Sequence, residues 1–181
     1  DKFPKPSETV VATCVKRTSF FFVSFGVGKW DKNTLGLMFN KFEDVVRQPT
    51  YKHKIKIYSD GNDDYTTVLP EYYHKDCLCY GQKIKTKDGK KIFPAIKKAI
   101  FGTPELWDIN TNNVECFNTI LRDRLSRLVR KSQCHAKNKY ALEDALYVFQ
   151  FYWNFMHQVH KKQTPAILEK QATKIWTWGS F

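Results

Sequence analysis

The sequence lacks any uninterrupted run of about eighteen apolar residues, the length that an α-helix needs to cross a membrane, and no signal peptide is visible in it. It also lacks a disulfide framework, because its five cysteines are an odd number without the spacing of one. Such cysteine usage is typical of a reducing compartment. These absences predict a protein that neither spans a membrane nor depends on disulfides.

A complete set of zinc ligands is missing as well. His74, Cys77 and Cys79 have a spacing that is compatible with half of a zinc site, but the usual second pair of ligands is absent. Cys134 and His135 form the only other pair, and their spacing is poor. A structural zinc ion therefore stays a minor alternative.

Positive charge, in contrast, is abundant. The 30 lysine and arginine residues outnumber 18 acidic ones, which gives a formal net charge of +12 over 181 residues. This charge favours a polyanionic partner, most simply nucleic acid, over an anionic membrane surface or solubility alone. With 42% hydrophobic and 15% aromatic residues, the chain has enough apolar material for one globular core.

The pattern over 112–132 predicts a helix. It has an apolar stripe, one acidic residue beside that stripe, and several arginines in its second half. Its apolar residues recur at steps of three or four. They are Val114, Phe117, Leu121, Leu125 and Leu128. Glu115 lies one turn before Asn118 and two turns before Arg122, so this acid can face a pocket. The alternative is an amphipathic surface helix with a solvated basic face.

A second acid follows a predicted strand. Polar and apolar residues alternate over 54–59, which predicts a short strand that runs into Asp60 and Gly61, and a helix begins over 62–69. An acid at the carboxyl end of a strand, followed by glycine, is where α/β folds place chemistry. The alternative is an ordinary type I turn.

The remaining pattern predicts a β-hairpin with strands over 9–15 and 20–27, a helix over 34–46 and another over 139–160. The last helix has a wide apolar face that we expect in the core. Its members are Ala141, Leu142, Ala145, Val148, Phe149, Tyr152, Trp153 and Met156.

Lysines cluster around Asp88-Gly89, which is typical of a hairpin tip. They are Lys83, Lys85, Lys87, Lys90 and Lys91. We expect a basic insertion at about 75–108 that grips a DNA backbone through charge without reading its sequence. A solvated lysine-rich loop is the alternative.

Taken together, the two acid-bearing motifs resemble a known family. They are Tyr58-Ser59-Asp60-Gly61 with Tyr65, and NVECFN at 113–118 leading into LRDRLSRLVRK at 121–131. These motifs are similar to those of the DDE transposases of bacterial insertion sequences, in particular the insertion-sequence-one type and its eukaryotic Merlin relatives. The resemblance covers about 10–166. The chain departs from the family in having Cys116 where arginine is usual and Asn62 where tryptophan is common.

The resemblance implies an α/β (α+β) fold of the ribonuclease-H-like, retroviral-integrase-like type, with a mixed sheet flanked by helices. The catalytic core would span 1–166, and the aromatic tail 167–181 would dock on it or on a second protomer. An N-terminal DNA-reading module is expected to lie outside this chain. The order of hairpin, helix, strand with acid and further helices fits such a fold with its first strand lost or hidden.

The resemblance also implies an activity: strand cleavage at transposon ends and transfer of the 3′-hydroxyl into target DNA. Asp1, Asp60 and Glu115 would hold Mg²⁺ or Mn²⁺, in two ions, and Asn118 would support Glu115. Glu8 and Asp31 are alternatives to Asp1 as the first acid.

The basic side chains of the predicted helix would contact DNA. They are Arg122, Arg124, Arg127, Arg130 and Lys131. A homodimer or higher oligomer on DNA is implied, in the cytoplasm and associated with the nucleoid of a prokaryote, or in a eukaryotic nucleus. Two alternatives remain open: a domesticated, non-catalytic DNA-binding or assembly module of the same fold, and a ribonuclease-H-like nuclease.

Overall fold

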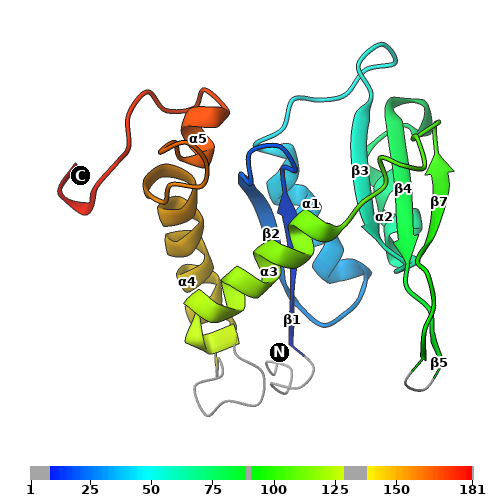
Figure 1. Ribbon diagram of the computed structural model, residues 1–181, viewed down its shortest axis with the longest axis horizontal. Coiled ribbons are helices and arrows are strands. Elements are labelled where there is room, and N and C mark those ends of the chain that lie inside the picture. The colour runs from blue at the N-terminus through cyan, green and yellow to red at the C-terminus, as the bar shows by residue number, and fades with distance from the viewer. Residues whose placement is uncertain (1–8, 89–90, 129–137, 181) are drawn as a thin grey trace.

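Two small β-sheets, joined and covered by helices, and a short two-stranded hairpin make up the described part of the molecule (Figure 1). The computed structural model describes residues 9–88, 91–128 and 138–180. In the first sheet β1 (Val10–Val15) pairs with β2 (Phe22–Gly28) in antiparallel fashion. In the second, β3 (Ile55–Asp60) runs parallel to β4 (Leu78–Ile84), which pairs antiparallel with β7 (Ile96–Phe101). The fold is therefore mixed α/β, with a mixed three-stranded sheet.

Helices pack on both sides of these sheets. The main ones are α1 (Lys32–Glu43), α2 (Asp64–Tyr72), α3 (Asn112–Arg124), α4 (Lys139–Phe151) and α5 (Pro165–Leu168). Helix α1 lies between the first sheet and α2, whereas α3 and α4 cover the opposite face of the first sheet (Figure 1). Within the described stretches no helix has both the length and the apolar character to cross a membrane.

The predicted hairpin is confirmed, and its second strand is buried on both faces. Close packing against α1 explains why β2 contains a glycine. A Cβ at Gly26 would lie only 2.2 Å from the backbone oxygen of Thr34 in α1. The helix therefore lies directly on the strand, with Leu35, Met38 and Phe39 buried in the core.

Two hydrophobic cores result. The first lies between α1, α2 and the second sheet: Leu35, Met38, Phe39, Phe42, Val68, Leu69, Leu78 and Tyr80 are among its buried residues. The second joins β2 to α3 and α4: Phe22, Phe25, Val27, Phe117, Leu121, Leu142, Leu146, Phe149 and Trp153. Strand β1 contributes to both, because Ala12 belongs to the first core and Val11 packs against the second.

Helix α3 is shorter than the stretch 112–132 predicts. It ends at Arg124, Leu125 is extended, and a short 3₁₀ turn (Ser126–Leu128) follows. Leu125 and Leu128 still pack against the second core from this turned chain. The apolar spacing is thus satisfied without a continuous helix.

The predicted helix over 139–160 is also wrong in its second half. Helix α4 ends at Phe151, and a π-helix (Tyr152–Met156) follows. Val148, expected in the core, is 57% exposed, while Leu146 is fully buried in its place. The wider π-turn brings the side chain of Asn154 into a buried contact with the backbone of β2.

The chain after the π-helix folds back on it. Thr164 caps α5 by accepting a hydrogen bond from the backbone N–H of Ile167. In the aromatic tail, the Trp176 N–H donates to the Phe155 carbonyl, and the Trp176 ring packs edge-on against Phe151.

The segment expected as a basic insertion supplies β4, the middle strand of the second sheet, with Leu78 and Tyr80 fully buried. The predicted hairpin connects β4 to β7 and is formed by β5 (Lys87–Asp88) and β6 (Lys91–Ile92). The segment is therefore an integral part of the sheet with a hairpin at its end.

Candidate functional site

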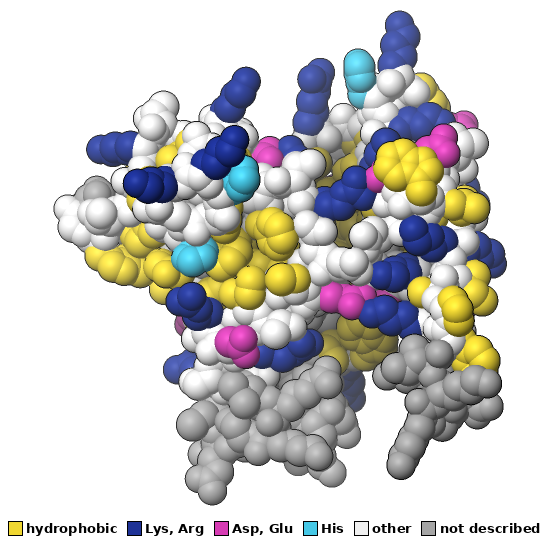
Figure 2. All heavy atoms as spheres, in the orientation of Figure 1, with side chains coloured by type: hydrophobic (Ala, Val, Ile, Leu, Met, Phe, Trp, Pro, Cys, Tyr) yellow, Lys and Arg dark blue, Asp and Glu magenta, His cyan; other side chains and the backbone are white. Residues whose placement is uncertain are grey.

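A groove of about 2130 Å³ separates the two sheets. Strands β1 and β3 form its walls, and α1 and α3 line its two sides. In Figure 2 the molecule is hollowed between its two halves, with hydrophobic side chains inside and basic ones spread over both halves. The volume exceeds the ~300–1,000 Å³ of ordinary small-molecule pockets.

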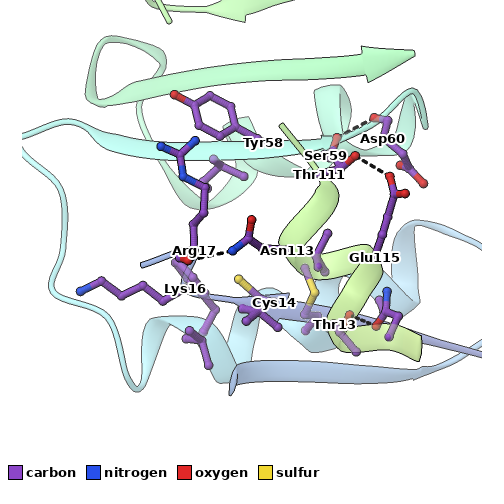
Figure 3. Close-up of a pocket in the computed structure, with 18 of the residues that line it drawn as sticks. Thr13, Cys14, Lys16, Arg17, Tyr58, Ser59, Asp60, Thr111, Asn113 and Glu115 are labelled. Atoms are coloured by element: carbon purple, nitrogen blue, oxygen red, sulfur yellow. Dashed lines mark hydrogen bonds between the residues drawn. The ribbon is translucent and has the colours of Figure 1, made fainter. Parts of the chain in front are cut away.

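The two predicted acids lie at one end of this groove. Asp60 is the last residue of β3, and Glu115 lies in the first turn of α3. Both line the groove, and in Figure 3 their carboxylates point toward one another. Asp60 is exposed, and the Asn62 N–H lies 3.4 Å from its Oδ1, which starts the turn into α2. Two acids that are 55 positions apart in sequence thus line the same end of the groove.

Glu115 has two hydrogen-bond donors. Its Oε2 accepts from Lys85 Nζ at 2.6 Å, and its Oε1 accepts from Thr111 Oγ1 at 2.6 Å. Partial burial disfavours the charged form, but the bonds from Lys85 and Thr111, together with the charge of Lys85 and of Lys83, outweigh it and lower the pKa of Glu115. Glu115 is consequently an ionised carboxylate with a fixed orientation at neutral pH.

One face of the second sheet is basic. Lys83 lies opposite Asp60 on β3 and opposite Lys97 on β7, so the three side chains share a face. Lys83 Nζ donates to Asn112 Oδ1 at 2.8 Å, and Lys97 Nζ donates to the Trp107 carbonyl at 3.2 Å. These lysines therefore meet the segment that leads into α3.

That segment approaches the sheet at a glycine. A Cβ at Gly81 in β4 would lie 2.5 Å from Cδ1 of Ile109, which is fully buried. The absence of a side chain at Gly81 lets residues 108–111 cross the face of the sheet. The crossing carries Thr111 and the start of α3 toward Asp60.

Asp108 forms a buried polar cluster that the sequence pattern did not indicate. Its Oδ1 accepts from Arg17 Nη2 at 2.5 Å and its Oδ2 from Tyr58 Oη at 2.7 Å, while Arg17 Nη1 donates to its carbonyl at 2.8 Å. The hydrogen bonds from Tyr58 and Arg17 outweigh burial and lower the pKa of Asp108. The cluster ties the β1–β2 turn to β3, at the end of the groove away from Asp60 (Figure 3).

The first predicted acid cannot be placed, because Asp1 lies outside the described residues, as does its alternative Glu8. The other alternative, Asp31, is the N-cap of α1: its Oδ1 accepts from the Thr34 N–H at 2.9 Å. Its carboxylate is therefore occupied by helix capping.

Of the predicted DNA-contacting residues, three lie outside the described part of the chain: Lys90, Arg130 and Lys131. Lys87 and Lys91 belong to the β5–β6 hairpin. Lys83 and Lys85 lie beside Asn112 and Glu115 of α3, to which they donate, and not at a projecting tip.

The predicted DNA-contacting arginines in α3 and in the turn after it lie in different surroundings. Arg122 lines the groove. Arg124 is exposed. The partial burial of His157 and, after it, the positive charge of Arg124 lower the pKa of His157. Arg127 Nη1 donates to the Ala141 carbonyl at 2.7 Å, so this residue joins the turn after α3 to α4.

Asn118, expected to support Glu115, instead accepts a hydrogen bond from Thr13 Oγ1 at 2.7 Å. The contact fixes the middle of α3 on β1, which α3 crosses (Figure 1). Thr111, which no motif singled out, has the supporting role toward Glu115.

The donor chemistry of Asp60 and Glu115 suits a hard divalent cation, which prefers carboxylate oxygens. Within the described stretches, however, no three acidic, histidine or cysteine side chains come together as a metal-binding group, and this includes His74, Cys77 and Cys79. The described residues therefore provide two carboxylates of the predicted three.

The chain matches no protein-family model, no curated protein and no solved structure. Its function therefore has to be inferred from the geometry of its own residues.

Proposed function

We propose that this protein is the catalytic core of a DDE-type transposase with a ribonuclease-H-like fold. One observation supports the proposal most. Asp60, at the carboxyl end of β3, and Glu115, in the first turn of α3, both line one end of the groove, and basic side chains flank it. Both carboxylates come from the two motifs that resemble the family.

The order of elements agrees with this proposal. A hairpin, a helix, a strand that ends in Asp60, a helix, a parallel strand, a small hairpin, an antiparallel strand and a helix bearing Glu115 follow one another. The departure is that the sheet is split between β1 and β3. The split lies beside the two acids and leaves the groove between the two strands.

Asp60 and Glu115 would hold Mg²⁺ or Mn²⁺. Bound there, such ions would polarise a water molecule or a 3′-hydroxyl and would offset the negative charge on the leaving oxygen. Thr111 keeps Glu115 in one orientation, because its hydroxyl is bonded to Oε1 and Thr111 itself is buried. Lys85 pairs with Glu115 when no cation is bound and can transfer to a DNA phosphate when one is. Lys83 and Lys97 extend the same phosphate-binding face.

A second candidate function is a non-catalytic DNA-binding module of the same fold. The ion pair between Lys85 and Glu115 favours it, since an ammonium group occupies the carboxylate that a metal would need. Both functions share the basic face and differ in metal binding.

The test measures Mn²⁺ binding by electron paramagnetic resonance and Mn²⁺-dependent nicking of supercoiled plasmid DNA. We expect the unaltered chain to do both, and Asp60→Asn and Glu115→Gln to lose both while still binding DNA. Asp76→Asn, which changes an exposed acid in a 3₁₀ turn, is the matched control and should change neither. Nicking at the unaltered rate by either site variant would contradict the proposed catalytic role. DNA binding without Mn²⁺ binding by the unaltered chain would select the second candidate.

A further inference from the structure

Three lysines near the end of the chain have a backbone conformation that favours glycine and asparagine. Among the described residues, the non-glycine residues with a positive φ are Phe20 at 57°, Lys161 at 44°, Lys162 at 61° and Lys170 at 58°. A side chain makes this left-handed region unfavourable, because its Cβ comes too close to the backbone carbonyl oxygen. Three of these four strained residues therefore carry a positive charge, and they lie between positions 161 and 170.

Lys161 and Lys162 form the tip of a two-residue hairpin. His160 and Gln163 pair across it, and the Gln163 N–H donates to the His160 carbonyl at 2.7 Å. A positive φ at both central residues is typical of a type I′ turn, for which Asn-Gly is a favoured sequence. Lysine at both positions therefore costs stability relative to Asn-Gly.

Lys170 lies in a strained turn as well, at the end of α5. The Gln171 N–H donates to the Ala166 carbonyl at 2.8 Å. The Lys170 N–H donates to the Ile167 carbonyl at 3.0 Å, which completes a Schellman motif. Lys170 follows the C-cap residue Glu169, at the position where glycine is usual. Both turns thus place lysine where glycine or asparagine would be more stable.

The three lysines form one positive surface. All three are exposed, and only the four-residue helix α5 and its caps separate the two turns. None of the ion pairs among the described side chains includes them. In Figure 2 lysine, arginine and histidine side chains gather on the half of the molecule where Figure 1 shows α5. The charge of this surface is therefore available to another molecule.

The surface lies on the opposite side of the groove from the basic face of the second sheet. Figure 1 shows α5 and the second sheet on opposite sides of β1 and β2. Glu169 and Gln171, the neighbours of Lys170, line the same groove as Asp60 and Glu115. Nucleic acid in the groove would therefore meet positive charge on both sides.

We propose that Lys161, Lys162 and Lys170 form a second phosphate-binding surface, which holds the backbone of a nucleic-acid duplex on the side of the groove opposite the second sheet. Two tight turns fix the backbone of the three lysines, so their charges are presented together. Lysine binds phosphates without reading the base sequence. The inference rests on the proposed function only for the partner, nucleic acid, and it needs neither bound metal nor strand cleavage.

Two triple variants separate the charge from the backbone strain. The first removes the charges and keeps the strained turns: Lys161→Gln, Lys162→Gln and Lys170→Gln. The second removes the same charges with residues that suit the turns: Lys161→Asn, Lys162→Gly and Lys170→Gly. Urea denaturation should give the second variant a folding equilibrium constant on the order of tenfold or more above those of the glutamine variant and the unaltered chain.

Binding is measured by fluorescence anisotropy with a labelled duplex in the presence of EDTA, at several salt concentrations. We expect both variants to bind on the order of tenfold more weakly than the unaltered chain, with a slope of log K against log salt concentration smaller by about 0.9 for each phosphate that is no longer neutralised. The matched control removes three exposed lysines elsewhere and should keep the unaltered slope: Lys32→Gln, Lys52→Gln and Lys54→Gln.

Three results would overturn the inference. The first is unaltered duplex binding by both triple variants. If replacing Lys83, Lys85 and Lys97 by glutamine still weakens binding, that result leaves the proposed function in place and removes only the second surface. The second is equal stability of the two triple variants, which would show that the turns are not strained. The third is loss of binding to phosphatidylglycerol vesicles with unchanged duplex binding, which would assign the surface to a membrane.

Discussion

At the scale of single residues, Asp108 and Glu115 are both held ionised by hydrogen bonds, but they differ in surroundings. Asp108 is 9% exposed and bonded to Arg17 and Tyr58, which are distant in sequence. The Glu115 side chain is 45% exposed and open to the groove. The buried acid is therefore suited to holding elements together, and the open one to exchanging Lys85 for another cation.

Asp108→Asn should lower the free energy of unfolding by about 1.5–3 kcal/mol, the range for hydrogen bonds that involve a charged group. The lower part of the range is favoured because the Arg17 side chain is 44% exposed. Urea denaturation measures the change. Glu105→Gln, three residues earlier and exposed, is the control and should be near neutral. A neutral Asp108→Asn would mean that the cluster does not hold the hairpin to β3.

The pH dependence of Glu115 follows from its lowered pKa. A carboxylate whose native pKa lies below its ordinary value of 4.5 stabilises the fold above that pH, and loses this contribution as the pH falls through the native pKa. Glu115→Gln should therefore destabilise by less than about 1 kcal/mol at pH 7, since the pair with Lys85 is half exposed. The difference should shrink as the pH falls below 4.5 and through the native pKa. Denaturation at pH 7 and at a series of lower pH values measures it, and a difference that grows as the pH falls would contradict the assignment.

Which site residues could be predicted depends on whether their signal is local. Asp60 follows a strand whose alternation is visible, and Glu115 lies beside a periodic apolar stripe, so both could be identified from the sequence. Asp108 could not, because its partner Arg17 is 91 residues away and no spacing links them. Thr111 carries no such signal either, because its role depends on the path over Gly81.

At the scale of elements, local spacing predicts the apolar faces better than it predicts the ends of helices. Phe117 and Leu121 are buried as predicted, yet α3 ends at Arg124. In α4 the predicted face is wrong at Val148, which is 57% exposed, whereas Leu146 and Phe149 are buried, and after Phe151 the chain continues as a π-helix. Both breaks are set by tertiary contacts: Arg127 with the Ala141 carbonyl, and Asn154 with Phe22.

Asn154 of the π-helix should stabilise the start of β2, where it satisfies the backbone of Phe22. Asn154→Leu removes both bonds to Phe22 and leaves its N–H buried without that acceptor, at a cost of about 2–3 kcal/mol. Thermal or urea unfolding measures the loss. Gln158→Leu, an exposed amide replaced in the same way just after the π-helix, should be close to neutral. Equal stability of the two variants would show that the Asn154 amide does not stabilise the start of β2.

At the scale of the whole molecule, a net charge of +12 is useful for nucleic-acid binding only where it is concentrated near the groove. Lys83 and Lys97 lie on the face of the second sheet that also bears Asp60, and Lys85, just after β4, pairs with Glu115. We expect this face to bind the DNA backbone. Replacing all three by glutamine should weaken binding and reduce the slope of log K against log salt concentration by about 0.9 for each phosphate that is no longer neutralised.

The matched control replaces Lys52, Lys54 and Lys174 by glutamine. These lysines are exposed and lie in the loop before β3 and in the tail, so the same three charges are removed elsewhere. Fluorescence anisotropy with a labelled duplex, titrated at several salt concentrations, compares the two variants at equal net charge. A local phosphate-binding face predicts that only the first variant has a smaller slope. Equal slopes for both would mean that total charge, and not the face beside Asp60 and Glu115, determines binding, and the DNA would then have to be placed elsewhere on the molecule.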